Sequence, residues 1–228
     1  PEPIPVSKNY SVTSLGEYLR CPRKYYLNNI VGIPERLFYK RESTQLGLSP
    51  WEKGTIVHEL IEKIHRENIC KNNAEKLSHT VKQQMTFEDR EFIQRCLQNY
   101  LESDIYNNNI SKTIYSETPF SYYLEKGRYI TGIVDQIIFE KDSLTIVDFK
   151  TDVSLNSTLL ESYIFQVKAY SMAASEVYNV KPKRAIILSL SSGESIEVDT
   201  CPPALQEFKT GICRLIDNID NNVFNEKA

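Results

Sequence analysis

Hydrophobic residues recur with the spacing of an α-helix in three long segments of the chain. In the segment 52–70 they lie three or four residues apart, at Ile56, Val57, Leu60, Ile61 and Ile64. This period places them on one face of a helix. The segment 86–103 has the same period, and Thr86 and Asp89 are spaced as a capping box at its start. The segment 158–178 is the third predicted helix.

Further helices are predicted towards the two ends of the chain. Ser11 or Thr13 can cap a helix that Pro22 then interrupts. A last helix is predicted over about 203–220. The segment 72–84 is polar and rich in Asn and Lys, and we expect it to be a flexible loop.

The pattern changes from helical to strand-like in the middle of the chain. The runs 117–124, 128–140 and 144–150 are of β-type and are separated by short polar turns, so they predict an antiparallel meander. After the helix that follows them, the run 184–190 predicts a buried strand and 194–198 a short one. This order of elements predicts an α/β fold.

No internal repeat interrupts this order, and the elements predict a single domain. Residues 1–10 are spaced by proline and are expected to be a linker that enters it. The domain then covers 11–228, with a helical part over about 11–105, an α/β core over about 115–200 and the C-terminal helix. Because the first residue is not Met, we expect the chain to be processed or part of a longer protein.

Composition and charge narrow the class of protein. The chain has 228 residues, 41 % of them hydrophobic and 25 % charged, which is ordinary for a globular protein that buries a core. A net charge of −3 argues against a protein that coats nucleic acid, but it allows an enzyme that binds DNA in one groove. No membrane span or signal peptide is evident. Five cysteines without a Cys-x-x-Cys pair favour a reducing, cytoplasmic setting.

Two aspartates and a lysine on neighbouring predicted strands form the candidate chemistry. Asp148 and Lys150 share one face of their strand because side chains alternate, and a hairpin can bring Asp135 beside Asp148. Two close carboxylates repel each other unless a cation lies between them, and a hard divalent ion suits oxygen ligands. The ammonium of Lys150 would stabilise charge on a reacting phosphate. Alternatively, strand ends often carry exposed Asp, and Asp-x-Lys can be a simple surface ion pair.

Several motifs in one order make the chain resemble a known family, the PD-(D/E)XK nuclease superfamily and its RecB/AddA-like branch. They are SLGEYLRCPRKYYL at 14–27, GTIVHELIE at 54–62, ETPF at 117–120, GIVDQI at 132–137, VDFKT at 147–151 and QVKAY at 166–170. The resemblance covers about residues 11–190. It implies a restriction-endonuclease-like core, a mixed central sheet flanked by helices, with an N-terminal helical elaboration.

The resemblance also implies roles for matching residues. The metal ligands would be His58, Asp135, Asp148 and the backbone carbonyl of Phe149. Lys150 would be the catalytic lysine. Gln166 and Tyr170 would position the DNA or that lysine, and Glu117 would support the site from behind the ligands.

Each of these residues also has a structural explanation. A lone His on a helix is usually a surface or core residue, which is what we expect of His65 and His79. Gln166 and Tyr170 can form a packing face, since they are four residues apart on one helix. Glu117 can be an exposed strand carboxylate.

The implied cofactor is Mg²⁺ or Mn²⁺. Some members of the branch hold an iron–sulfur cluster on one N-terminal and three clustered C-terminal cysteines. Cys21 matches the first position, but only Cys201 and Cys213 follow in the C-terminal part. We therefore expect no cluster, and expect Cys21 to be a buried thiol.

Basic residues with aromatic residues between them could form a channel for a strand, or else a solvated face over a core. The basic ones are Arg20, Arg23, Lys24, Arg36, Lys40, Arg41 and Lys168. The aromatic ones are Tyr25, Tyr26, Phe38 and Tyr39. Phosphate contacts and base stacking are the interactions that such a channel would supply.

The function implied is a metal-dependent DNA nuclease that hydrolyses phosphodiester bonds, as the nuclease module of a helicase–nuclease in DNA repair or recombination. Its partners would be a DNA single strand or duplex end, and a helicase motor in the same longer chain or complex, because this chain has no P-loop. One alternative is a non-catalytic DNA-binding or assembly module of the same fold. Another is a stand-alone endonuclease that processes DNA or RNA.

Overall fold

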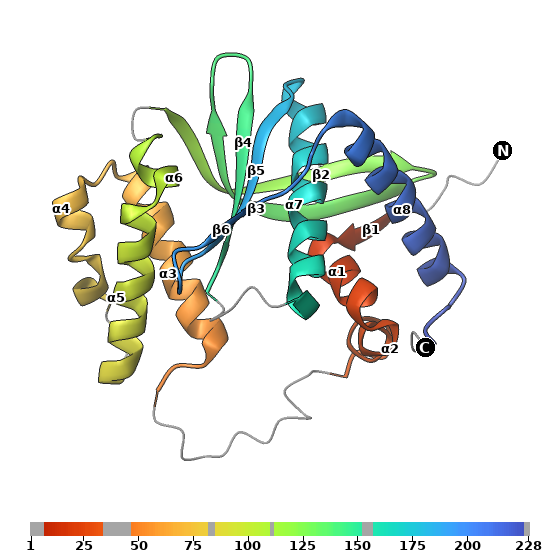
Figure 1. Cartoon of the computed structure of the whole chain (residues 1–228). Coiled ribbons are helices and arrows are strands. Elements are labelled where there is room, and N and C mark those ends of the chain that lie inside the picture. Colours follow the sequence, from red (N-terminus) through yellow and green to blue (C-terminus); the bar gives the residue numbers. More distant parts are fainter. Residues whose placement is uncertain (1–6, 34–46, 82–84, 110–111, 152–156, 226–228) are drawn as a thin grey trace.

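The computed structural model describes residues 7–33, 47–81, 85–109, 112–151 and 157–225. Within these ranges, six strands form one mixed sheet and helices cover both of its faces (Figure 1). This is a three-layer α/β arrangement of the restriction-endonuclease-like kind that the motifs imply. No helix in the described ranges has both the length and the apolar character that crossing a membrane requires.

The strands are β1 (Lys8–Ser11), β2 (Thr113–Glu125), β3 (Arg128–Phe139), β4 (Leu144–Lys150), β5 (Pro182–Ser189) and β6 (Ser195–Glu197). Their order is β1-β3-β4-β5-β6, with β2 paired to β3. The antiparallel meander of β2, β3 and β4 confirms the prediction from the sequence. β4 and β5 are parallel, because α7 (Ser157–Tyr178) crosses over between them.

Strand β3 has different partners at its two ends, and this difference opens the sheet. β2 pairs with β3 along one edge. On the opposite edge, β1 pairs with residues 128–131 and β4 pairs with residues 136–139. Among the described strands, none pairs with residues 132–135 on that edge. β3 and β4 therefore diverge beyond the pair of Gln136 and Val147.

Two groups of helices bury the two faces of the sheet (Figure 1). On one face are α1 (Val12–Arg20), α7 and α8 (Pro202–Asp220), and on the other are α3 (Pro50–Arg66), α5 (Phe87–Glu102) and α6 (Asp104–Asn107). Each group encloses its own hydrophobic cluster against the strands. The positions of α5, α7 and α8 confirm the predicted helices to within one residue at each end.

Helix α3 is shifted from the segment predicted for it. It begins at Pro50, because Ser49 and Glu52 form a capping box and a proline fits the first turn of a helix. It ends at Arg66 rather than at residue 70, and Asn68 follows with a φ of 50°. Asn tolerates this left-handed conformation, which stops the helix.

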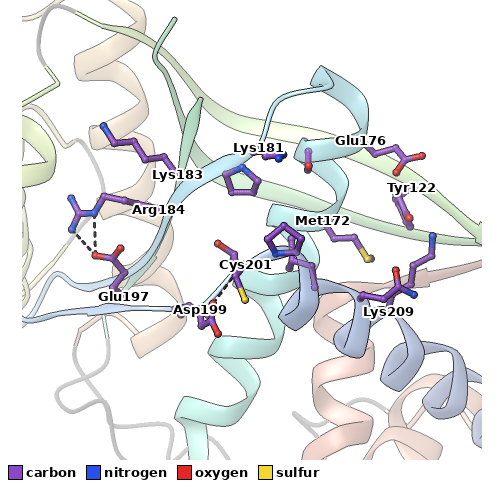
Figure 2. A pocket seen from close by; sticks show the side chains of 17 residues that line it. Tyr122, Met172, Glu176, Lys181, Lys183, Arg184, Glu197, Asp199, Cys201 and Lys209 are labelled. Carbon is purple, nitrogen blue, oxygen red and sulfur yellow. Dashed lines mark hydrogen bonds and ion pairs between the residues drawn. The ribbon is translucent and has the colours of Figure 1, made fainter. Parts of the chain in front are cut away.

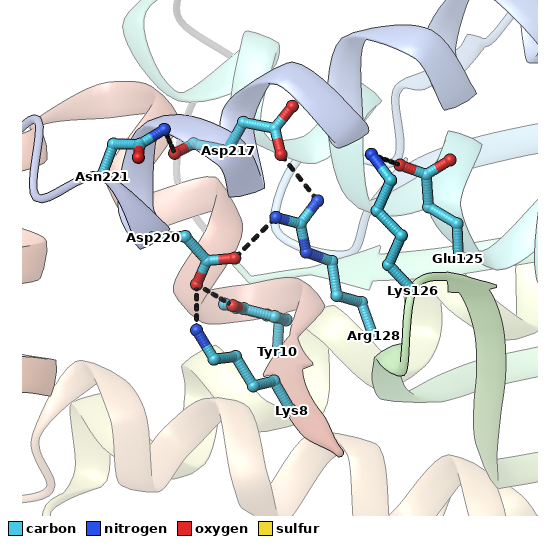
Figure 3. A network of polar contacts seen from close by, with 8 residues as sticks. All are labelled: Lys8, Tyr10, Glu125, Lys126, Arg128, Asp217, Asp220 and Asn221. Atoms are coloured by element: carbon cyan, nitrogen blue, oxygen red, sulfur yellow. Dashed lines mark hydrogen bonds and ion pairs between the residues drawn. The ribbon is translucent and has the colours of Figure 1, made fainter. Parts of the chain in front are cut away.

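Strand β1 occupies the last residues of the segment expected to be linker-like. It is anchored from the other end of the chain, because Asp220 on α8 accepts hydrogen bonds from Lys8 at 2.7 Å and Tyr10 at 2.6 Å. Arg128 on β3 reaches Asp217 and Asp220, both at 2.7 Å (Figure 3). These contacts tie β1, β3 and α8 together.

The polar segment 72–84, expected to be a flexible loop, contains ordered turns. α4 (Lys71–Ala74) and a 3₁₀ turn (Leu77–Thr80) lie within it. Ala74 and Leu77 are buried in the cluster around α3 and α5, and Val81 packs against it, so burial orders a segment that is otherwise polar. Residues 82–84 lie outside the described part.

Candidate active site

The candidate site lies where β3 and β4 diverge. Asp135 is the first residue of β3 beyond the last pair with β4. Instead of a ladder bond, its carboxylate Oδ2 accepts a hydrogen bond of 2.6 Å from the backbone N–H of Phe149. The side chain of Asp135 thus satisfies a backbone group that the end of the ladder leaves free. The same bond holds its carboxylate at the opening of the sheet.

Burial, and after it the charge of Asp148, raises the pKa of Asp135 to about 6. His58 and Lys150 oppose the shift. The side chain of Asp148 is 1 % exposed. Two carboxylates this well shielded from water repel each other strongly, so the site favours a bound cation.

His58 from α3 and Glu117 from β2 complete a cluster with Asp135. His58 Nδ1 lies 3.4 Å from Glu117 Oε1 and 3.7 Å from Asp135 Oδ1. One ligand atom from each of the three residues lies within 4.8 Å of the others. Burial lowers the pKa of His58, but the charges of Asp135 and Glu117 outweigh it and the net shift is upward.

Glu117 has an unusual backbone for a strand residue. Its φ is 46°, in the left-handed region that side chains with a Cβ rarely adopt. Strain of this kind collects at functional sites. The resemblance implies Asp148 as a ligand and Glu117 as a support. In the structure, the carboxylate of Glu117 lies in the cluster with His58 and Asp135, and Asp148 pairs with Lys150.

Lys150 is held from several sides. Its Nζ lies 2.8 Å from Asp148 Oδ2, donates a 3.0 Å hydrogen bond to Gln166 Oε1, and lies 4.8 Å from the ring centre of Tyr163. Asp148 and Lys150 meet because they are on one face of β4, as strand alternation predicts. Phe149 points to the opposite face and packs in the cluster beneath α3.

Two glycines allow the elements to approach the site. A Cβ on Gly54 would lie 3.1 Å from Thr151 Oγ1, next to Lys150, so this glycine lets α3 approach the end of β4. A Cβ on Gly132 would lie 2.9 Å from the ring of Phe120 and 3.2 Å from that of Tyr170. The close contacts at these two positions explain why the motifs around His58 and Asp135 begin with Gly.

Tyr170 lies behind the carboxylates. It is 5 % exposed, and its ring meets Phe120 edge to face at 5.7 Å. Burial raises its pKa, and the charges of Asp148, Asp135 and Glu117 raise it further. Tyr170 and Gln166 therefore both reach the site from one helical face, as their spacing allows.

The remaining sequence expectations have mixed outcomes. His65 contacts the Tyr100 hydroxyl and ring, in the core, which confirms the structural role expected for it. Cys21 is only half-buried, so the expected buried position is wrong. Its Sγ accepts a 3.4 Å hydrogen bond from the Lys24 N–H and caps α2 (Pro22–Tyr25).

The structure brings only some of the residues expected for a basic channel together at the site. Arg20 and Lys24 line a groove of 410 Å³ whose wall also contains Tyr163 and Gln166, beside Lys150. Tyr25 is buried in the core, so it is not available to stack on a base of a bound nucleic-acid strand. Arg36, Phe38, Tyr39, Lys40 and Arg41 lie outside the described residues.

Two residues at the site were not singled out from the sequence. The sequence does not distinguish Tyr163 from other apolar residues of its helix, although it precedes Gln166 by one turn. Trp51 lies in the first turn of α3, with Gly54, His58 and Lys150 on the same cleft of 650 Å³. The Ser-Pro-Trp-Glu cap at 49–52 would have revealed its place at the helix start.

A larger cavity of 770 Å³ lies elsewhere, between α7, β5, β6 and α8 (Figure 2). Its charged side chains are partly paired, with Arg184 3.0 Å from Glu197, and Cys201 lies at its centre in the view. The residues predicted for catalysis do not line it. His58, Glu117 and Lys150 line the smaller cleft of 650 Å³ instead.

Comparisons with known proteins agree with this geometry. Residues 9–227 match the profile of the PD-(D/E)XK nuclease superfamily. An ATP-dependent helicase/nuclease polypeptide from Listeria monocytogenes is 24 % identical over 180 residues, and its counterpart from Ligilactobacillus salivarius is 24 % identical over 191 residues. These matches cover 67 % and 75 % of this chain but 14 % and 15 % of the relatives.

A solved structure shows the likeness of fold. It is that of a candidate exonuclease from Eubacterium rectale, with a TM-score of 0.54 and 11 % sequence identity. The superposition covers 96 % of this chain and 84 % of that one. The shared fold therefore extends over nearly all of this chain.

Proposed function

The chain belongs to the PD-(D/E)XK nuclease superfamily, and from this premise we propose that it is a divalent-metal-dependent nuclease that hydrolyses phosphodiester bonds of DNA. One observation carries the proposal. His58, Glu117 and Asp135 converge within 4.8 Å, beside an Asp148–Lys150 pair of 2.8 Å. A binding module without catalysis would have no need of a lysine held between an acid and an amide beside such a cluster.

The residues of the cluster fit a divalent cation. Their ligand atoms are one imidazole nitrogen and carboxylate oxygens, and oxygen ligands suit Mg²⁺ and Mn²⁺. The upward shift in the pKa of Asp135 reflects burial beside Asp148, a penalty that a cation would relieve. We assign His58, Asp135 and Glu117 as side-chain ligands, with Asp148 and the Phe149 carbonyl adjoining them. When bound, the cation would act as a Lewis acid on the phosphate and lower the pKa of a water molecule.

Lys150 has the main role among the residues of the chain itself. Its ammonium would donate to a phosphate oxygen and stabilise the negative charge that grows there during hydrolysis. Asp148 and Gln166 hold Nζ in place from two sides, so little reorganisation is needed when a phosphate arrives. Tyr170, behind the carboxylates, would help position the strand or the lysine.

We further propose that the chain works with a helicase motor, in the same longer chain or in a complex. The relatives named as ATP-dependent helicase/nuclease components support this, since the chain matches only about a seventh of their length. A role in repair or recombination, inside the cell, follows from such a partnership. The same relatives favour this over a stand-alone endonuclease.

The test is cleavage of labelled strands by the purified chain. Single-stranded DNA, duplex DNA and RNA are each incubated with Mg²⁺, Mn²⁺ or EDTA. We expect cleavage of DNA with either cation and none with EDTA. If DNA is bound but remains uncut with every divalent ion, the chain is a binding module instead. Cleavage of RNA alone would favour the stand-alone processing enzyme.

A further inference from the structure

Trp51 is the single tryptophan of the chain, and it lies on the surface. Its side chain is 77 % exposed, the largest exposed fraction among the large hydrophobic residues of the described part. An indole gains much free energy from burial and is enriched where proteins meet ligands. An indole left in water beside a catalytic cleft is therefore a candidate contact for a ligand.

The residues around Trp51 indicate which ligand the indole would contact. Trp51, Gly54, Thr55 and His58 follow one another along the face of α3 that lines the cleft, and Lys150 lines the same cleft from β4. The exposed ring therefore shares one cleft with His58 and Glu117 of the ligand cluster and with Lys150. A ligand that reaches Lys150 passes close to the indole.

The spacing fits a nucleotide chain. Trp51 precedes His58 by seven residues, which is about 10 Å along a helix at about 1.5 Å per residue. Successive stacked nucleotides of one strand rise by about 3.4 Å, so the indole lies about three nucleotides from the reacting phosphate. A flat aromatic ring at that distance matches the flat face of a base.

We propose that Trp51 is a stacking platform for an unpaired base, and that the site therefore takes single-stranded nucleic acid. This inference rests on the proposed nuclease function and gives its substrate class. A base can stack on an indole only when it is free of its complementary strand. The cleft volume of 650 Å³ is also that of a small-ligand pocket, which suits a few nucleotides of one strand.

The charges in the cleft restrict the path that a bound strand can take. Glu59 and Glu62 line the cleft on the far side of His58 from Trp51. These carboxylates repel phosphates, whereas Lys150 attracts them. The strand therefore runs from Lys150 towards Trp51, and away from the C-terminal half of α3.

Because the chain has a single tryptophan, fluorescence excited at a wavelength that its 14 tyrosines do not absorb reports on Trp51 alone. The purified chain is titrated in EDTA, which keeps the strand uncut, with an oligothymidylate, a duplex, and a strand of abasic sites. We expect the single strand to quench the indole. The duplex and the abasic strand should leave its intensity nearly unchanged, because neither offers an unpaired base.

Variants measured with a labelled oligonucleotide complete the test. Trp51→Ala should raise the dissociation constant for the single strand by about tenfold, the effect of losing one stacked base. Trp51→Phe keeps an aromatic face and should recover most of the affinity. Phe87→Ala is the matched control, since Phe87 is 70 % exposed in the first turn of α5 and does not line the cleft.

The outcomes separate this inference from the proposed function. If the wild type cuts DNA but single strands neither quench Trp51 nor lose affinity in Trp51→Ala, the stacking role is wrong and the nuclease stands. Equal quenching by the abasic strand would also overturn it, as would an indole that responds only to a protein partner. If the wild type cuts nothing while an oligothymidylate quenches Trp51, the nuclease assignment fails and the binding site stands.

Discussion

Gln166 touches Lys150 and does not belong to the carboxylate cluster, so we propose that it is a positioning residue. Its Oε1 accepts a hydrogen bond from Lys150 Nζ at 3.0 Å. We predict that Gln166→Ala lowers kcat by about tenfold with little change in KM, because groups that orient a reacting residue are worth about 10–100-fold. Gln166→Glu, which keeps an acceptor oxygen, should recover part of the rate. The measurement is steady-state cleavage of a labelled strand.

Gln98→Ala is the control for that variant, since Gln98 bonds to Glu102 on the exposed side of α5. A loss of rate in Gln98→Ala equal to that in Gln166→Ala would contradict the positioning role. So would a change confined to KM, because that would assign Gln166 to strand binding.

Glu117 combines a proposed ligand position with a strained backbone, and the two effects can be separated. Removing the carboxylate should weaken Mn²⁺ binding by tenfold or more in both Glu117→Ala and Glu117→Gly. Only glycine relieves a φ of 46°, so Glu117→Gly should be more stable than Glu117→Ala by about 1 kcal/mol. Calorimetry with Mn²⁺ and urea unfolding give the two quantities. Wild-type Mn²⁺ affinity in both variants would remove Glu117 from the ligand set.

At the scale of elements, Asp89 joins the starts of two helices. Its carboxylate accepts hydrogen bonds from the backbone of Leu48 and Thr86 and lies 2.9 Å from Lys53 Nζ on α3. We predict that Asp89→Ala lowers the free energy of unfolding by about 2–3 kcal/mol, from a lost cap and lost charge-assisted bonds. Glu88→Ala, one residue earlier and exposed, should cost well under about 1 kcal/mol. Urea unfolding measures both.

The same residue gives an acid dependence of stability. Burial opposes ionisation of Asp89, but Lys53 and the backbone donors outweigh it and lower its pKa from 3.8 to about 2. The unfolded chain therefore binds the proton more readily, so this stabilisation is complete above about pH 4 and is lost as the pH falls towards 2. The stability difference between wild type and Asp89→Asn should shrink over that range. A constant difference would contradict the assigned contacts.

Elements with a local signal were predicted well, and those that depend on distant partners were not. The capping box at Thr86 and the spacing of apolar residues in α7 are local, and both helices lie where the sequence places them. β1 has only four residues, and its partner on β3 starts at Arg128. No local pattern reveals such a pairing, so these residues resemble a linker.

In the candidate site too, contacts within one element could be predicted from the sequence, and contacts that depend on distant elements could not. Alternation along β4 is enough to pair Asp148 with Lys150. The separation of β3 from β4, which turns Asp135 towards the Phe149 N–H, arises from the whole sheet and is not visible in either strand alone. The place of Glu117 in the cluster with His58 and Asp135 depends on its positive φ, which the sequence does not show.

At the scale of the whole molecule, a net charge of −3 means that phosphate binding must be local. Arg20 lines the groove that continues past Gln166, and it is exposed. We predict that Arg20→Ala weakens single-strand binding and reduces the slope of log affinity against log salt by about 0.7, the value for one phosphate contact. Arg214→Ala, exposed on α8, should leave the slope unchanged. Equal slopes in wild type and Arg20→Ala would remove this groove from the path of the strand.

Lys150, between Asp148 and Gln166, is proposed to serve hydrolysis beside a cluster of metal ligands. The most direct measurement is the single-turnover rate of DNA cleavage in saturating Mn²⁺ for wild type, Lys150→Ala and the control Lys183→Ala, whose lysine pairs with Glu140 away from the site. We predict a loss of about 10²–10³-fold in Lys150→Ala, with Mn²⁺ binding and unfolding transition retained, and no loss in Lys183→Ala. Cleavage at the wild-type rate by folded Lys150→Ala would contradict the account.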